Sequence, residues 1–224
     1  MRVLVSWSSG KDSALAFYMV KHVLKLDVRG FITTIDLSTN TVSGHGISLH
    51  ILREQIRRIR EPLYEIGLPK DLPPTRIYEE IMIRELSRLK ELLKVEGVVF
   101  GDIHIEDMIE FKRKLLAKID LEAVFPLISM SSAEVVNRFI DLGFKALVVA
   151  VDSSKLDRSY ICRELNHDLV RSLPRDVDIA GEYGEYHTLV FDGPIFEKPL
   201  ELVVRGVRES ENKKILCDLD VEKR

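Results

Sequence analysis

The segment from Ser8 to Ser13, which reads SSGKDS, gathers the side chains that proteins use to bind phosphate. The Lys11 ammonium supplies a positive charge for phosphate oxygens, and each serine hydroxyl can donate one hydrogen bond. An apolar run at 3–5 precedes the segment, and a helical pattern begins at Asp12. Backbone N–H groups at such a helix start converge on an anion, assisted by the helix dipole. The residues therefore predict a phosphate-binding loop between a strand and a helix.

The loop is not a Walker A motif, because Val5 and Asp12 stand where that motif needs a glycine and a serine or threonine. A serine-rich turn that caps an ordinary helix is the alternative interpretation. The strand before the loop and the helix after it favour nucleotide binding. The residues expected to contact nucleotide are Ser8, Ser9, Gly10, Lys11, Asp12 and Ser13, and Lys11 is also expected to be catalytic.

A second cluster, Gly101 and Asp102, directly follows the apolar run VVF at 98–100. In a parallel sheet, ligands bind beyond the carboxyl ends of the strands, which is also where the phosphate loop must lie. We expect both residues to contact the nucleotide, with the Asp102 carboxylate accepting from ribose hydroxyls or holding magnesium. On local grounds, Asp102 could equally be a cap for the following helix.

The segment 180–194 contains the densest group of chemically active side chains, since Glu182, Glu185, His187 and Asp192 fall within it. Carboxylates beside a histidine can bind a cation, an amine or ammonium, or can move protons. We expect Glu182, Glu185 and His187 to be catalytic. The alternative is a turn whose polar groups are satisfied locally before a strand at 188–191.

A weaker candidate is His45, which lies between two glycines after the strand that ends near Asp36. Glycines in a loop allow close approach to a triphosphate, so His45 joins the expected nucleotide contacts. A lone surface histidine without a role is the alternative.

These residues need a scaffold, and the first half of the chain predicts an α/β fold. Strand-like runs at 2–7, 28–35 and 97–101 alternate with helical patterns, which is typical of a parallel sheet covered by helices. Apolar residues of the second predicted helix recur at helical spacing at Leu49, Leu52, Ile56, Ile59, Leu63 and Ile66. Another face carries the arginine stripe Arg53, Arg57 and Arg60, interpreted as solvated, with contact to an acidic partner as the alternative.

A third helix is expected at 78–94, ended by Gly97 and stabilised by an ion pair of Glu80 with Arg84.

Beyond Pro126 the pattern changes, and we place a boundary between a domain at 1–125 and a second domain at 126–224. The second domain is expected to contain helices from Ser131 to about Gly143 and at 158–173, and a strand at 146–151. Its end, with apolar runs at 200–207 and 214–221, predicts a β-hairpin.

Composition limits the function classes. The 224 residues carry a net charge of −3 and are 31% charged, so no basic field for a nucleic-acid partner is present. No stretch approaches the length of about 18 apolar residues that a membrane span needs, so we expect a cytoplasmic protein without a membrane partner. Cys162 and Cys217 form no CxxC pair, which argues against zinc, an iron–sulfur cluster or a disulfide framework and favours structural thiols.

Taken together, these motifs resemble the ATP-binding PP-loop family that includes diphthine ammonia ligase, within the N-type ATP pyrophosphatases and adenine nucleotide alpha hydrolases. The resemblance covers nearly the whole chain, and its most specific part is GEYGEYHT followed by DGPIF. The motifs are WSSGKDS at 7–13, HG at 45–46, FGDI at 100–103, ED at 106–107, VD at 151–152, LD at 156–157, GEYGEYHT at 181–188 and DGPIF at 192–196.

The resemblance implies a Rossmann-like nucleotide domain followed by a smaller α+β C-terminal domain, with the GEYGEYHT loop facing ATP across a cleft. It implies ATP and Mg²⁺ as cofactors, with Asp12 as the magnesium ligand. The implied reaction adenylates a carboxylate, releases pyrophosphate and lets ammonia displace AMP. In the ligase that carboxylate belongs to diphthine on translation elongation factor 2, so the implied partners are ATP, ammonia and that factor, with a homodimer as the assembly.

Two departures from the family pattern bear on this expectation. Ligases of the eukaryotic and archaeal type carry an arginine-rich helix with a glutamate and a cysteine after GDI, whereas residues 105–114 here read IEDMIEFKRK. Ser9 stands where the family usually has glycine, a milder change. The alternatives are a ligase or pyrophosphatase for another small carboxylate, and a regulatory protein that binds ATP or AMP without turnover. Thiolation of tRNA is disfavoured, because paired cysteines and a basic surface are both absent from the sequence.

Overall fold

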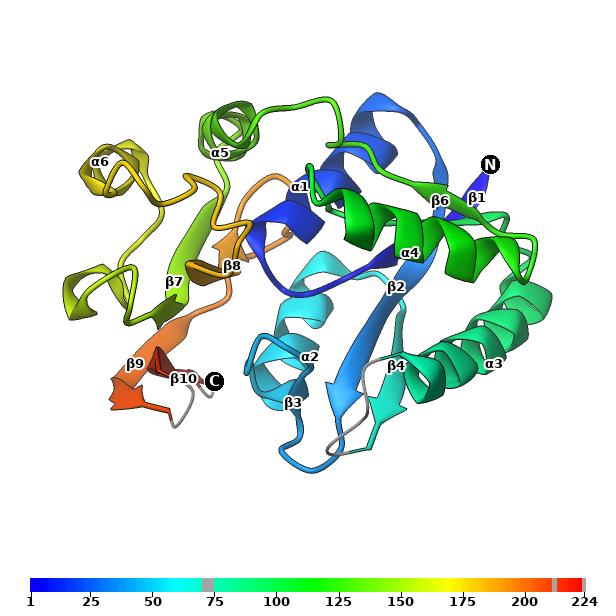
Figure 1. The fold of residues 1–224 in the computed structure, drawn as a ribbon, viewed down its shortest axis with the longest axis horizontal. Helices are drawn as coiled ribbons and strands as arrows, with labels where there is room; N and C mark the ends of the chain where they lie inside the picture. The colour runs from blue at the N-terminus through cyan, green and yellow to red at the C-terminus, as the bar shows by residue number, and fades with distance from the viewer. Residues whose placement is uncertain (70–74, 211–212, 223–224) are drawn as a thin grey trace. The chain divides into compact units, whose positions relative to one another are not determined.

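A computed structural model describes residues 1–69, 75–210 and 213–222 and contains two β-sheets (Figure 1). The first sheet has the order β3-β2-β1-β5-β6, and β4 pairs with β2. All of its pairings are parallel except that of β3 with β2, so the predicted parallel α/β sheet is confirmed. Its strands are β1 (Arg2–Ser6), β2 (Asp27–Asp36), β3 (Thr41–Val42), β4 (Leu63–Leu68), β5 (Gly97–Val99) and β6 (Glu122–Val124).

Helices cover this sheet because their apolar stripes need a partner surface. Leu86 and Leu89 of α3 (Arg76–Leu93) and Leu116 of α4 (Glu106–Ala117) pack in one core with Leu4 and Val98 of the strands. Phe17 of α1 (Lys11–Tyr18) meets the Phe31 ring at 4.8 Å between centroids. A π-helical turn, Met19–Val23, continues α1.

In this half, the predicted end of one helix is wrong, and so is the residue expected to end another. Helix α2 (Leu49–Ile59) ends before Leu63 and Ile66, which belong to β4. Arg60 adopts a left-handed φ of 61° and Pro62 follows it, so the helix cannot continue.

Likewise, Lys94, with φ 54°, ends α3, while Gly97 starts β5. A Cβ at Gly97 would lie 2.8 Å from the Glu122 carbonyl oxygen, so close strand approach explains this glycine. The expected Glu80–Arg84 ion pair is also wrong, since Glu80 pairs with Arg76 at 3.0 Å.

The second sheet is antiparallel and has the order β8-β7-β10-β9. The predicted terminal hairpin is confirmed as β9 and β10. Its elements are β7 (Lys145–Asp152), β8 (Tyr186–Asp192), β9 (Leu202–Glu209) and β10 (Lys214–Val221), with helices α5 (Ser132–Asp141) and α6 (His167–Ser172).

The helix predicted at 158–173 is wrong as one continuous helix, because its middle is not helical. A 3-10 turn (Arg158–Tyr160) and α6 occupy its two ends. Between them, the Cys162 N–H donates to Val148 O at 2.8 Å and the Leu165 N–H donates to Ala146 O at 2.8 Å. Pairing with β7 therefore replaces the helical hydrogen bonds of this segment.

The interpretation of the cysteines as unpaired structural thiols is also wrong. Cys162 and Cys217 form a disulfide with their Cα atoms 5.5 Å apart. They are 55 positions apart in the sequence, so spacing gave no sign of the pairing.

The chain forms two compact units, and no single boundary in the sequence separates them. One unit contains 1–8, 15–49 and 61–129, and the other contains 9–14, 50–60 and 130–224. The first sheet lies in the first unit, and the phosphate loop shares the second unit with the antiparallel sheet. The domain boundary at 125 stays a prediction.

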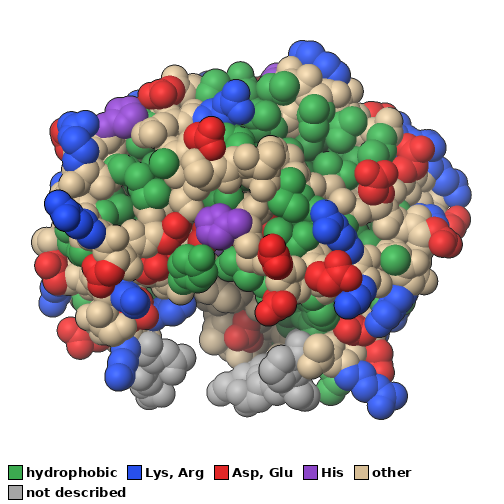
Figure 2. Space-filling view, turned by 45° about the horizontal axis from the view of Figure 1, so that its top comes forward, with side chains coloured by type: hydrophobic (Ala, Val, Ile, Leu, Met, Phe, Trp, Pro, Cys, Tyr) green, Lys and Arg blue, Asp and Glu red, His purple; other side chains and the backbone are tan. Residues whose placement is uncertain are grey.

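Basic and acidic side chains are interspersed on the face shown in Figure 2. Within the described ranges, no helix has the length and apolarity that crossing a membrane requires.

Candidate functional site

The phosphate loop has the strand–turn–helix form expected from the sequence. Helix α1 begins at Lys11, and the Gly10 carbonyl accepts from the Ala14 N–H at 3.1 Å and from the Ser13 hydroxyl at 2.9 Å. Ser9 adopts a left-handed φ of 70° and is fully buried. Within the described residues, its hydroxyl has no hydrogen-bond partner.

This loop is attached to the edge of β8. The Ser9 carbonyl accepts from the Val190 N–H at 2.9 Å and from Gln55 Nε2 at 3.1 Å. Gln55, from α2, also donates to the Val190 carbonyl at 2.7 Å. Sequence reasoning missed Gln55, although a polar residue three positions after Leu52, on the apolar face of that helix, was a usable signal.

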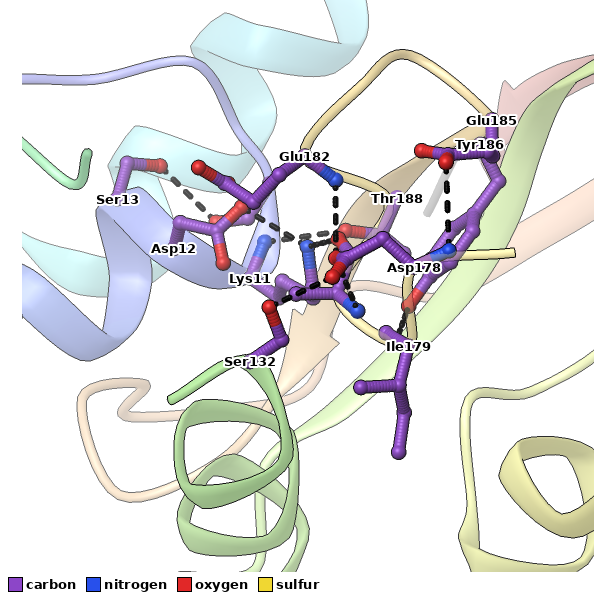
Figure 3. A network of polar contacts seen from close by, with 12 residues as sticks. Lys11, Asp12, Ser13, Ser132, Asp178, Ile179, Glu182, Glu185, Tyr186 and Thr188 are labelled. Atoms are coloured by element: carbon purple, nitrogen blue, oxygen red, sulfur yellow. Dashed lines mark hydrogen bonds and ion pairs between the residues drawn. The ribbon is translucent and has the colours of Figure 1, made fainter. Parts of the chain in front are cut away.

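Both the backbone and the ammonium of Lys11 make polar contacts with neighbouring residues (Figure 3). Its backbone N–H donates to Thr188 Oγ1 at 3.1 Å, and its ammonium pairs with Asp12 Oδ2 at 2.9 Å. The ammonium also donates to the Ala180 carbonyl and lies 5.3 Å from the centre of the Tyr186 ring. Burial alone would lower the Lys11 pKa, but Asp12 and the neighbouring groups outweigh burial and raise the pKa above its ordinary value. Lys11 is thus a buried and charged side chain.

The segment 178–188, which contacts Lys11, is stabilised by hydrogen bonds to two of its own carboxylates. Asp178 accepts from the Ser132 hydroxyl at 2.7 Å and from the Ala180 N–H at 2.9 Å (Figure 3). Glu185 is buried and accepts from the Asp178 N–H at 3.2 Å and from the Tyr183 N–H at 3.0 Å. Asp178 was missed because its role depends on contacts with α5 that no local pattern predicts.

The Tyr186 phenol completes the bracing by donating to the Ile179 carbonyl at 2.6 Å. Burial raises the pKa of Tyr186. Because the phenol stays protonated, it remains a donor across the physiological pH range.

The structure brings only some of the predicted catalytic residues together. The Glu182 N–H donates to Asp178 at 3.3 Å, beside Lys11 in the same network. His187 lies between Tyr186 and Thr188 in β8, so its side chain points to the opposite face of the strand. There its Nε2 lies 3.3 Å from Lys214 Nζ.

A cavity of about 280 Å³ lies in the first unit, beside the carboxyl ends of β1 and β5. Two of the predicted nucleotide contacts, Ser8 and His45, line it. Thr33 also lines it and is buried, and within the described part of the chain the Thr33 hydroxyl has no hydrogen-bond partner. Other lining residues are Ser6, Trp7, Tyr78, Phe100, Met108 and Lys112.

Asp102, another predicted nucleotide contact, is not among the residues that line this cavity, and its carboxylate is paired. Both of its oxygens accept from Lys112 Nζ at 2.6 Å, and that ammonium lies 4.9 Å from the centre of the Phe100 ring. Burial and the nearby Asp102 charge raise the pKa of Tyr78. Lys112, which sequence reasoning missed, places a cation at the lining of the cavity, and it lies one helical turn after Met108.

Magnesium would need oxygen ligands at the loop. No group of three or more histidine, cysteine or acidic side chains suited to a metal occurs in the ranges the structure describes. Asp12 fits a magnesium ion that keeps its waters and phosphate ligands, since such ions need only one or two carboxylates.

The arginine stripe is partly paired within the chain. Arg57 pairs with Glu54, and Arg60 pairs with Glu197 at 2.6 Å. These pairs agree with a solvated face.

Comparisons with known proteins give two matches along the chain. The diphthamide synthase N-terminal domain family matches residues 1–122, and the diphthamide synthase C-terminal domain family matches residues 131–223. A diphthine–ammonia ligase from Mus musculus is 26% identical over 176 residues, which cover 71% of this chain and 63% of the mouse protein. The chain therefore spans less than two thirds of that relative's length.

Two solved structures are also similar, each at 14% identity. The U34-tRNA thiolase NcsA from Methanococcus maripaludis, with its [4Fe-4S] cluster, has a TM-score of 0.41 over 64% of this chain and 57% of that one. A predicted subunit of a tRNA methyltransferase from Methanocaldococcus jannaschii has a TM-score of 0.38 over 70% of this chain and 80% of that one.

Proposed function

Because the chain belongs to the diphthamide synthase family, we propose that it is an ATP-dependent amide ligase of the diphthine–ammonia type. Its acceptor would be the diphthine carboxylate on translation elongation factor 2, and its nitrogen source would be ammonia.

The proposed reaction has two steps. A carboxylate oxygen attacks the α-phosphorus of ATP, and the bond to the β-phosphate oxygen breaks to release pyrophosphate. Ammonia then attacks the acyl carbon of the adenylate, loses a proton and displaces AMP, leaving an amide. The loop N–H groups and Lys11 would stabilise the charge that develops on the phosphates.

The network around Lys11 is the observation that carries this proposal. It joins the phosphate loop to the segment 178–188 through Thr188 and Ala180, so the two most specific motifs meet within one unit. Glu182 lies in that network and is our candidate for handling ammonium or the acceptor.

The nucleoside is proposed to occupy the cavity lined by Ser8, Thr33 and His45. The buried hydroxyls of Ser9 and Thr33 would find partners in the bound nucleotide. Asp12 would hold Mg²⁺, which supplies charge neutralisation on the phosphates when bound.

Turnover tests the proposal directly. Incubation with ATP, ammonia and elongation factor that carries unamidated diphthine should yield AMP, pyrophosphate and the mass change of amide formation. Lys11→Ala should abolish AMP formation, whereas Lys114→Ala, at an exposed ion-paired lysine, should leave it unchanged. Circular dichroism of Lys11→Ala checks its folding, because Lys11 is buried. AMP release at an undiminished rate from folded Lys11→Ala would contradict the role of Lys11.

One observation favours a second candidate, a regulatory protein that binds ATP or AMP without turnover. The Lys11 ammonium is already held by Asp12 and Ala180. This candidate predicts nucleotide binding with no pyrophosphate release for any acceptor. A ligase for another small carboxylate would instead release AMP only when that acceptor replaces the elongation factor.

A homodimer and a cytoplasmic location stay predictions. Sedimentation of the purified protein would determine the assembly.

A further inference from the structure

We propose that Gln55 is a positioning residue for the nucleotide phosphates and acts through the peptide between Ser9 and Gly10. This inference rests on the proposed ATP site, since it assigns a residue that shapes that site without touching the ligand.

The contacts of Gln55 define one geometry for its amide. The side chain is fully buried, and its Nε2 donates to the Ser9 carbonyl at 3.1 Å and to the Val190 carbonyl at 2.7 Å. An amide NH₂ has two hydrogens, so these two bonds use its full donor capacity. A leucine could fill the same space but could not donate to either carbonyl.

The Ser9 carbonyl matters because it shares a rigid plane with the Gly10 N–H. In a trans peptide the two groups point in opposite directions, so holding the oxygen also directs the N–H. Gln55 and the Val190 N–H hold this oxygen from α2 and β8. The Gly10 N–H is thereby directed to the side of the peptide away from both elements.

The next peptide is held by separate partners. The Gly10 carbonyl accepts from Ala14 and Ser13, and the Lys11 N–H donates to Thr188. Loss of Gln55 would therefore remove one of the two hydrogen bonds that hold the Ser9 carbonyl and loosen that peptide plane, while the start of α1 stays in place.

A comparison of ATP binding with adenosine binding distinguishes a positioning role of Gln55 from a role in folding alone. Gln55→Leu is expected to weaken ATP binding by about tenfold, the effect of one lost hydrogen bond to a charged group, while adenosine binding stays unchanged. Calorimetry measures both affinities, and thermal unfolding checks the fold. Ile56→Ala is the matched control, because it removes a buried side chain of the same helix without touching either carbonyl. It should lower the unfolding temperature and leave the ratio of the two affinities unchanged.

Equal weakening of ATP and adenosine by Gln55→Leu, or no change in either, would overturn the inference. Gln55→Met, which follows the shape of glutamine more closely, replaces the leucine variant if that variant does not fold. If neither variant folds, Gln55 is a structural residue and the positioning role is overturned. Failure of the wild-type protein to bind ATP would instead contradict the proposed function.

Discussion

At position 9, serine adopts a backbone conformation that glycine adopts more readily. Its φ is 70°, and its buried hydroxyl has no hydrogen-bond partner among the described residues. By residue type alone, serine in place of glycine is a mild change, because the N–H is kept. The backbone angle shows that the change also carries a conformational cost.

Ser9→Gly is expected to raise the free energy of unfolding by about 1 kcal/mol, because it relieves the left-handed strain and removes an unsatisfied buried hydroxyl. Urea denaturation measures the change. Lys94→Gly relieves a similar angle at an exposed helix end and should gain less. A less stable Ser9→Gly variant would mean that the hydroxyl has a structural partner.

At the scale of elements, local and distant hydrogen bonds decide where helices start and stop. Helix α5 begins as predicted, because Ser131 and Glu134 form a capping box. The segment at 161–165 has no comparable local device, and its backbone pairs with β7 instead of forming a helix.

The capping box makes the stability of α5 depend on pH. The N–H and hydroxyl of Ser131 each donate to Glu134 at 2.7 Å and hold the pKa of Glu134 below its ordinary value. A depressed pKa stabilises the fold above the ordinary glutamate pKa of about 4.3, and the effect is lost as the pH falls through the folded-state value. Glu134→Gln should therefore be less stable than the native chain at neutral pH and equal to it in strong acid. Urea midpoints at the two pH values measure this, and a difference that persists in acid would contradict it.

The disulfide joins the segment after the 3-10 turn to β10 across 55 positions. In the chain-entropy account, closing a loop of this length stabilises a protein by about 4 kcal/mol. Cys217→Ser is expected to lower the free energy of unfolding by that order, measured by denaturation without reductant. Cys162→Ser and the double variant should show the same loss, because all three remove one bond. Additive losses would show that the thiols contribute separately.

At the scale of the whole molecule, the chain passes between the two compact units five times, after residues 8, 14, 49, 60 and 129. The phosphate loop and most of α2 thus belong with the antiparallel sheet, although they lie early in the sequence. A division at residue 125 would cut the chain between the loop and the β8 edge that holds it.

We expect the two units to unfold in one transition. Each unit is built from several stretches of the chain, and stretches of the other unit lie between them in the sequence. The single tryptophan, Trp7, belongs to the first unit and reports on it by fluorescence, while far-ultraviolet circular dichroism reports on all helices and strands. The two denaturation curves should coincide. Loss of the Trp7 signal at a lower denaturant concentration would show that the first unit unfolds independently.

Local sequence determined the strand–turn–helix form of the loop at 8–13, the parallel α/β sheet, the α5 cap and the terminal hairpin. Each depends on residue types at short spacing, whose effects on the backbone are the same in any protein. Family membership could also be recognised from such motifs, because GEYGEYHT and SSGKDS are contiguous.

Only the tertiary structure decided which of these residues meet. It placed His187 on the far side of β8 from Thr188, and it buried Lys11 against Ala180. It also paired Cys162 with Cys217 and brought Gln55 to the Ser9 carbonyl. These contacts join residues that are tens to more than a hundred positions apart, and their geometry is set by packing and strand direction rather than by local residue type.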